Sequence, residues 1–205
     1  MHLIQKFAAL CLITMSAHTT TAQTELPQVT LHTTMGNIVV QLDTVRAPIT
    51  SANFMRYVQG GHYDHGAFYR TVRLANDNGS PKIEVIQGGM NLSIGATTPF
   101  PPIQHESTDV TGLTHTDGTI SMARGAVNTA ASEFFICIGA QPGLDSGAPR
   151  NADGLGFAAF GQVISGMDVV RRIHESSSDS PTAQAYVAGQ IIDEPVVITR
   201  TSLSD

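Results

Sequence analysis

The sequence predicts a single mainly β domain whose first and last strands close a sheet into a barrel. Nineteen glycines and ten prolines in 205 residues, with no long apolar run of helical periodicity, favour short strands joined by turns. Two strand-forming runs flank a small polar loop over residues 118–138, which is the pattern of a bent hairpin. The run at 195–200 can pair with the run at 28–33, and this pairing would close the sheet.

The first 22 residues have the composition of a secretory signal peptide. They contain one lysine, Lys6, and no acidic residue, and an apolar segment at 7–17 precedes small residues that end at Ala22. This segment is too short to span a bilayer, so we expect no membrane anchor. The expected division is a signal peptide at 1–22 and one domain at 23–205. Export to a periplasm is the first expectation, and secretion is the alternative.

The mature chain begins with a predicted hairpin and a helix. Residues 28–33 and 37–42 are strand-forming and meet across Met35-Gly36. Pro48 then opens a helix over 49–59, because proline suits the first helical turn. A second helix is expected at 167–174.

The central hairpin carries two adjacent aromatic residues, Phe134 and Phe135. Successive side chains of a strand point to opposite faces, so the two rings cannot share one environment. One ring is expected in the core and the other at a surface groove or in a second apolar cluster. Cys137 follows on the same strand, and as the single cysteine of the mature chain it is predicted to be a buried, inert thiol.

Two further strands bring polar groups to a sheet face. The strand at 68–72 carries Arg70 among apolar neighbours, and a strand at 83–86 ends at Gln87-Gly88-Gly89. A guanidinium beside a carboxamide and exposed aromatic rings makes a site rich in hydrogen-bond donors with an apolar floor.

The order of these motifs resembles the cyclophilin-type peptidyl-prolyl cis-trans isomerases over most of the mature chain. No single motif is specific, but several in the family's order are. The matching residues are Tyr63-Asp64, Phe68, Arg70, Gln87-Gly88-Gly89, Gly118, Ser121-Met122-Ala123, Asn128-Thr129, Ser132, Phe134-Phe135-Ile136, Phe160-Gly161-Gln162-Val163 and Gly166-Met167.

The resemblance implies a closed eight-stranded antiparallel barrel capped by two α-helices, with an outer groove that accepts an X-Pro segment. It implies that Arg70 and Gln87 are the catalytic pair. It also implies a set of substrate-binding residues, with the backbone of Arg124 bonding the substrate chain: Val85, Ala123, Arg124, Phe135, Leu144, Phe157 and Glu84.

The implied reaction needs neither a cofactor nor a metal. Rotation about an X-Pro bond faces a barrier of ~18–20 kcal/mol, because the nitrogen lone pair is delocalised into the carbonyl. A cation that donates toward the prolyl nitrogen favours the unconjugated, twisted state over both planar states. A ~10⁵-fold acceleration corresponds to roughly 7 kcal/mol.

This sequence departs from the family pattern at several positions around the expected groove. Glu84 stands where many relatives have an aromatic residue, and Glu133 replaces the usual glutamine before the paired phenylalanines. A carboxylate near Arg70 could orient it or compete for it. Gly143 lies where some members have tryptophan, and Phe157 where many have histidine. Two loops, 73–82 and 146–155, are longer than in compact members and are expected to flank the groove.

Other functions are less well supported by the sequence. A formal net charge of −6 argues against nucleic acid or an anionic membrane as a partner. His62 and His65 lie in one polar loop with Asp64, but two imidazoles without a further clustered donor are typical of a plain polar loop, and Asp64 falls inside the family motif, so no metal site is expected. The main alternative is a binding or chaperone module that keeps the groove but has lost turnover. The expected partners are proline-containing polypeptides, and the protein is expected to act as a monomer.

Overall fold

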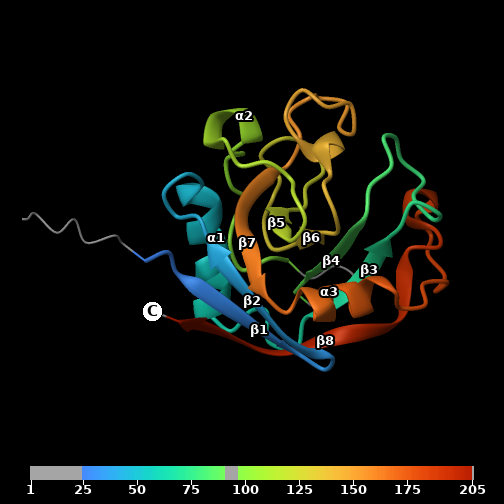
Figure 1. The fold of residues 1–205 in the computed structure, drawn as a ribbon, viewed down its shortest axis with the longest axis horizontal. Coiled ribbons are helices and arrows are strands. Elements are labelled where there is room, and N and C mark those ends of the chain that lie inside the picture. Colours follow the sequence, from blue (N-terminus) through green and yellow to red (C-terminus); the bar gives the residue numbers. More distant parts are fainter. Residues whose placement is uncertain (1–24, 91–96, 205) are drawn as a thin grey trace, which may run out of the picture.

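The computed structural model of the chain describes residues 25–90 and 97–204, so the expected signal peptide lies outside the described residues. Eight antiparallel strands form a closed barrel in the order β1-β2-β7-β5-β6-β4-β3-β8 (Figure 1). The strands are β1 (Gln28–Thr33), β2 (Gly36–Leu42), β3 (Ala67–Val72), β4 (Val85–Gly89), β5 (Thr119–Met122), β6 (Phe134–Cys137), β7 (Ala158–Ser165) and β8 (Ile191–Ser204). The predicted closure between the first and last strands is confirmed, because β1 pairs with β8.

Two helices pack on the barrel, as predicted. They are α1 (Pro48–Gln59) and α3 (Met167–His174), and buried residues of both join the cluster that fills the barrel. A four-residue helix, α2 (Thr108–Thr111), was not predicted. The first amides of α1 donate to the distant carboxylate of Glu106, from Ile49 N at 3.1 Å and from Thr50 N at 2.7 Å. This carboxylate satisfies amides that have no partner within the helix.

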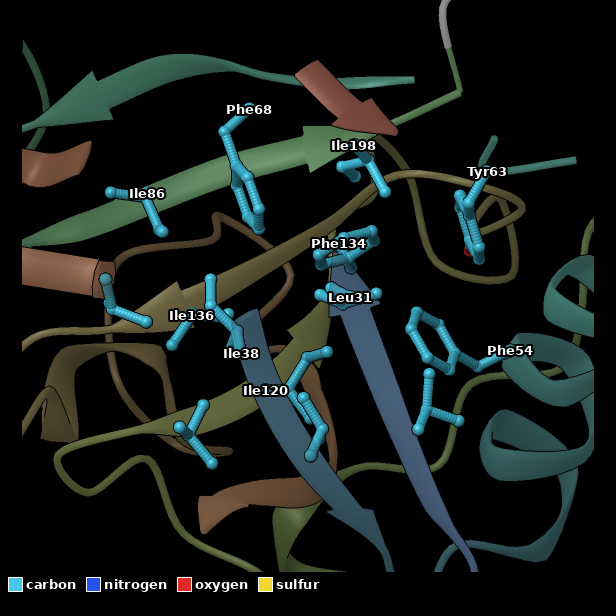
Figure 2. Packing of buried hydrophobic residues seen from close by; sticks show 14 of the residues in the cluster. Leu31, Ile38, Phe54, Tyr63, Phe68, Ile86, Ile120, Phe134, Ile136 and Ile198 are labelled. Carbon is cyan, nitrogen blue, oxygen red and sulfur yellow. The ribbon is translucent and has the colours of Figure 1, made fainter. Parts of the chain in front are cut away.

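The barrel interior is filled by apolar side chains that alternate along the strands. Phe134 lies edge-to-face against both Phe54 and Phe68, with ring centroids 5.4 and 5.7 Å apart. Figure 2 shows these rings with Leu31, Ile86, Ile120 and Ile136 pointing toward a common centre. The side chains come from strands on every side of the barrel, so the core fixes the positions of the strands that carry the outer-face residues.

The structure corrects the predicted bounds of two strands. β4 begins at Val85 instead of at 83 and continues through the glycines to Gly89, so Glu84 precedes the strand instead of lying within it. β8 extends well beyond 195–200 at both ends because it pairs with β1 along one part and with β3 along another. A register shift opposite β3 accommodates Pro195, since proline cannot donate to a regular ladder.

Candidate active site

Alternate residues of β4 and β6 build two different apolar clusters. Ile86, Phe134 and Ile136 point into the barrel, where they are fully buried. Their neighbours point to the opposite face and form a second cluster there. That cluster comprises Val72, Ile83, Val85, Phe135, Cys137 and Leu144, with Ala123 and Phe157 packed against it. The predicted separation of the two phenylalanine rings is confirmed.

A groove of about 390 Å³ lies over the second cluster. Its floor is apolar and its walls carry arginine and carboxamide groups, which is the combination that a peptide with an apolar side chain requires. The lining residues are Arg70, Ile83, Val85, Gln87, Ala123, Arg124, Gly125, Phe135, Leu144, Arg150, Asn151, Ala152, Phe157 and Tyr186.

The Arg70 guanidinium is held between two carboxamides. Its Nη1 donates to Gln87 Oε1 at 2.7 Å, and its Nε and Nη2 donate to Gln190 Oε1 at 2.9 and 2.6 Å. Burial lowers the pKa of Arg70, but an arginine stays charged at neutral pH. Three of the five guanidinium donors are used in this way, and among the described residues one N–H on each terminal nitrogen has no hydrogen-bond partner.

A chain of hydrogen bonds connects Arg70 to the carboxylate of Glu133. Gln87 Nε2 donates to the Tyr69 hydroxyl at 2.8 Å, and that hydroxyl donates to Glu133 Oε2 at 2.6 Å. Burial raises the pKa of Glu133. The bond from Tyr69 fixes the hydroxyl as an acceptor for Gln87 and so orients the carboxamide, whose oxygen then faces Arg70. Glu133 therefore orients Arg70 through two intervening side chains.

The floor of the groove rests on a buried histidine. The imidazole of His115 stacks on Phe135 with ring centroids 5.9 Å apart and an interplanar angle of 16°. Its Nδ1 lies 2.7 Å from Asp145 Oδ1, and its Nε2 lies 3.0 Å from Ser121 Oγ. Burial lowers the pKa of His115, so the ring is neutral at pH 7. Ser121 is fully buried, so its hydroxyl has no access to substrate, and His115 acts here as a structural hydrogen-bonding group.

One side of the rim is closed by the side chain of Arg124. It donates to the carbonyl of Gly156 and forms an ion pair with Asp153, with Nη1 2.7 Å from Oδ2. Hydrogen bonds from Arg124 hold the pKa of Asp153 at about 2. The guanidinium carbon also lies 5.5 Å from the centroid of Phe157. Sequence reasoning assigned only the backbone of Arg124 to the site and did not foresee this bridge.

The other side of the rim is formed by the 146–155 loop, which packs against the 73–82 loop. Arg150 and Asp77 make a buried ion pair at 2.7 Å, and Arg150 also donates to the carbonyl of Pro81. Pro81 fills the space above Gly143, where an added Cβ would lie 2.6 Å from Pro81 Cγ. Residues 150–152 line the groove, so the prediction for the 146–155 loop is confirmed.

Most of the site residues expected from the sequence meet in this groove. Those that line it are Arg70, Gln87, Val85, Ala123, Arg124, Phe135, Leu144 and Phe157. Glu84 is not among them: its neighbours Ile83 and Val85 line the groove, whereas its backbone carbonyl accepts a hydrogen bond from Ile138 N and its side chain is not part of the lining. Sequence reasoning missed Gln190 and Tyr186, which belong to the loop after α3. Neither lies in a recognisable motif, and only the tertiary fold brings them to Arg70.

The donor set of the groove suits binding and electrostatic stabilisation. Within residues 25–90 and 97–204, no three histidine, cysteine, aspartate or glutamate side chains are grouped so as to hold a metal ion. The thiol of Cys137 is buried, and burial raises its pKa. A fixed cation beside an apolar pocket can bind an apolar group and stabilise a nearby hydrogen-bond acceptor without a covalent step.

Comparison with known proteins identifies the family. The family model described as cyclophilin type peptidyl-prolyl cis-trans isomerase/CLD matches residues 28–202. Peptidyl-prolyl cis-trans isomerase A of Dickeya dadantii is 33% identical over 160 residues, which cover 78% of this chain and 77% of the relative. Peptidyl-prolyl cis-trans isomerase B of Escherichia coli is 30% identical over 178 residues, which cover 86% of this chain and 99% of the relative. This chain belongs to the cyclophilin-type isomerases and is an enzyme of that type.

A solved structure supports the fold. The cyclophilin type peptidyl-prolyl cis-trans isomerase of Cryptosporidium parvum, crystallised in the presence of the dipeptide Ala-Pro, superposes with a TM-score of 0.67 at 19% sequence identity. The superposition covers 87% of this chain and 99% of that one. The predicted eight-stranded barrel with helices is thereby confirmed. Among the residues that the structure describes, no helix combines the length and apolarity needed to cross a membrane.

Proposed function

We propose that this isomerase acts on X-Pro bonds of exported proteins and assists their folding, with Arg70 as its catalytic cation. The observation that most strongly supports the catalytic role is the position of Arg70 beside the apolar groove. Two carboxamides fix its guanidinium, and two N–H groups remain for a bound peptide. A preorganised donor of this kind needs no rearrangement when the transition state forms.

The catalytic step is a rotation without covalent chemistry. As the peptide bond twists, the nitrogen lone pair leaves the amide system and becomes a hydrogen-bond acceptor. Arg70 donates to that nitrogen and stabilises the twisted state, while the planar cis and trans states offer no such acceptor. Gln87 keeps the guanidinium in place through its bond to Nη1.

The apolar floor holds the proline ring while the rest of the bond turns. Phe135, Leu144 and Val85 form this floor, and Phe157 meets Phe135 edge-to-face with centroids 5.3 Å apart. Ala123 and the backbone of Arg124 lie at the groove edge, where they are placed to bind the substrate chain. The Ala-Pro dipeptide named with the Cryptosporidium parvum enzyme supports a proline-containing substrate here as well.

A peptide assay that follows cis-trans exchange tests the role of Arg70. Replacement by alanine should lower kcat/KM at least ~100-fold, the scale expected for one preorganised donor. Arg70→Lys keeps the charge but loses the planar fork, so it should recover only a small part of the activity. The free energy of unfolding should change little. Turnover by Arg70→Ala within a few-fold of the parent would contradict the assignment, and a parent that binds proline peptides without turnover would favour the binding module.

Export is tested separately in a Gram-negative host. The complete chain and a form without residues 2–22 are expressed, and the cell fractions are compared. The proposal expects the complete chain outside the cytoplasm with a mature N-terminus near Gln23, and the shortened form inside. Retention of the complete, uncleaved chain in the cytoplasm would contradict export and leave the catalytic assignment untouched.

A further inference from the structure

A third loop reaches the groove between α3 and β8. Residues 175–190 follow α3 and include a short 3₁₀ turn, Ala185–Val187. In Figure 1 this segment, near the red end of the colour scale, lies beside the green loop that joins β3 to β4. Tyr186 of this turn lines the same groove as Arg70 and Phe135.

The ring of Tyr186 faces two guanidinium groups. The guanidinium carbons of Arg70 and Arg150 lie 5.8 and 6.0 Å from the ring centroid. Both distances are within the range of cation–π attraction. Both cations are fixed, Arg70 by its carboxamides and Arg150 by Asp77, so the ring is held in a defined position against the groove wall.

The ring is nevertheless largely open to solvent. Tyr186 is 54% exposed, and the backbone around it is anchored by other groups. Asn78 Nδ2 donates to the carbonyls of Tyr186 and Ala188 at 3.2 and 3.0 Å, and Asn76 Nδ2 donates to the carbonyl of Gly189 at 2.8 Å. The loop therefore does not depend on the Tyr186 ring for its position. A rigid, exposed aromatic ring is a surface on which a ligand can bind at low entropic cost.

We propose that Tyr186 is a substrate-contacting residue that binds an aromatic side chain next to the proline. This inference rests on the proposed function, because it places the X-Pro bond at Arg70. A ring above Arg70 lies beside the bond that turns, so the residues adjacent to proline are the ones within its reach. The outward part of the ring offers them apolar area and an aromatic edge. An aromatic pair of this kind stabilises a complex by more than the apolar area that it buries, and the additional free energy corresponds to a roughly fivefold gain in affinity.

The test uses the complete mature protein and matched peptides. The peptides differ only in carrying phenylalanine or glycine directly before or directly after the proline. Exchange is followed by NMR for the parent, Tyr186→Ala and Tyr186→Phe. Ile164→Ala serves as a control, because Ile164 is similarly exposed, at 47%, and does not line the groove.

At one of the two positions, the phenylalanine-to-glycine ratio of kcat/KM should fall roughly fivefold in Tyr186→Ala, mainly through KM. Tyr186→Phe and Ile164→Ala should keep the parent ratio. An unchanged ratio in Tyr186→Ala would overturn the proposal. An equal loss for both peptides through kcat would also overturn it, since Tyr186 would then act only through Arg70. Normal turnover by Arg70→Ala would instead show that the proposed function has failed.

Discussion

The two faces of β4 and β6 carry apolar clusters of similar burial but different purpose. Phe134 is fully buried in the barrel and touches rings from α1 and β3, whereas Phe135 is 5% exposed and lies on the histidine-backed floor of the groove. Hydrophobicity alone does not separate the two positions. The two positions differ in what surrounds them. Side chains of other strands and of α1 cover the ring in the barrel, and loop residues and arginine side chains surround the ring in the groove. We therefore expect mutations on the barrel face to act on stability and mutations on the groove face to act on turnover.

Neighbouring residues of β4 give the largest expected contrast. Ile86→Ala should lower the free energy of unfolding by roughly 2–5 kcal/mol, because it leaves a cavity in the closed barrel. Its kcat/KM per folded molecule should stay near the parent value. Val85→Ala should instead raise KM, since Val85 lines the groove. Denaturant unfolding and the exchange assay measure the two effects, and Ile86→Val serves if the alanine variant does not fold. A loss of activity in folded Ile86→Ala would break the division.

Gln190 tests whether turnover depends on how Arg70 is held. Gln190→Ala removes the acceptor for Nε and Nη2, so the guanidinium gains freedom and kcat should fall roughly tenfold. KM should change less, because Gln190 does not line the groove. Gln162→Ala is the matched control, since that carboxamide donates to the Asp117 carbonyl on another part of the barrel. Equal effects of the two replacements on kcat would contradict a positioning role.

Most of the fold could be predicted from the sequence, because the alternation of apolar and polar residues and the placement of turn residues determine local secondary structure. The hairpin at β1 and β2, both main helices and the opposite facing of Phe134 and Phe135 all follow from such local patterns. The site was predictable only where the family motifs extend, as at Arg70 and Gln87.

The remaining part of the site depends on contacts between residues far apart in the sequence. Gln190 and Tyr186 reach Arg70 from more than a hundred positions away, and no periodicity marks them. Glu84 shows the converse. Its position three residues before Gln87 in the family motif predicted that it lies at the groove. The strand begins one residue later, and the side chain is not part of the lining.

Glu133 directly precedes β6, and its replacement is expected to give the smallest effect, a change in how stability depends on pH. Burial raises the pKa of Glu133 in the folded state. The folded state then keeps this proton to a higher pH than the unfolded chain, whose glutamates titrate near pH ~4.3. This contribution to stability is complete below the unfolded pKa and is lost as pH rises through the folded pKa.

Replacement of Glu133 by glutamine removes this titration and keeps an oxygen for the Tyr69 hydroxyl. As pH rises above the unfolded pKa and through the raised folded pKa of Glu133, the parent should lose stability relative to Glu133→Gln. Urea unfolding of both proteins at a series of pH values measures the difference. Two parallel curves would show that the Glu133 carboxyl is not perturbed by folding.

The division between barrel and groove is tested most directly by Phe134→Leu and Phe135→Leu measured side by side. The residues are adjacent, the substitution is the same, and both side chains are buried. We predict that Phe134→Leu has the larger loss in free energy of unfolding with kcat/KM per folded molecule near the parent value. Phe135→Leu should show the larger loss in kcat/KM with the smaller loss in stability. The reverse pattern, or equal losses of both quantities in the two variants, would contradict the account.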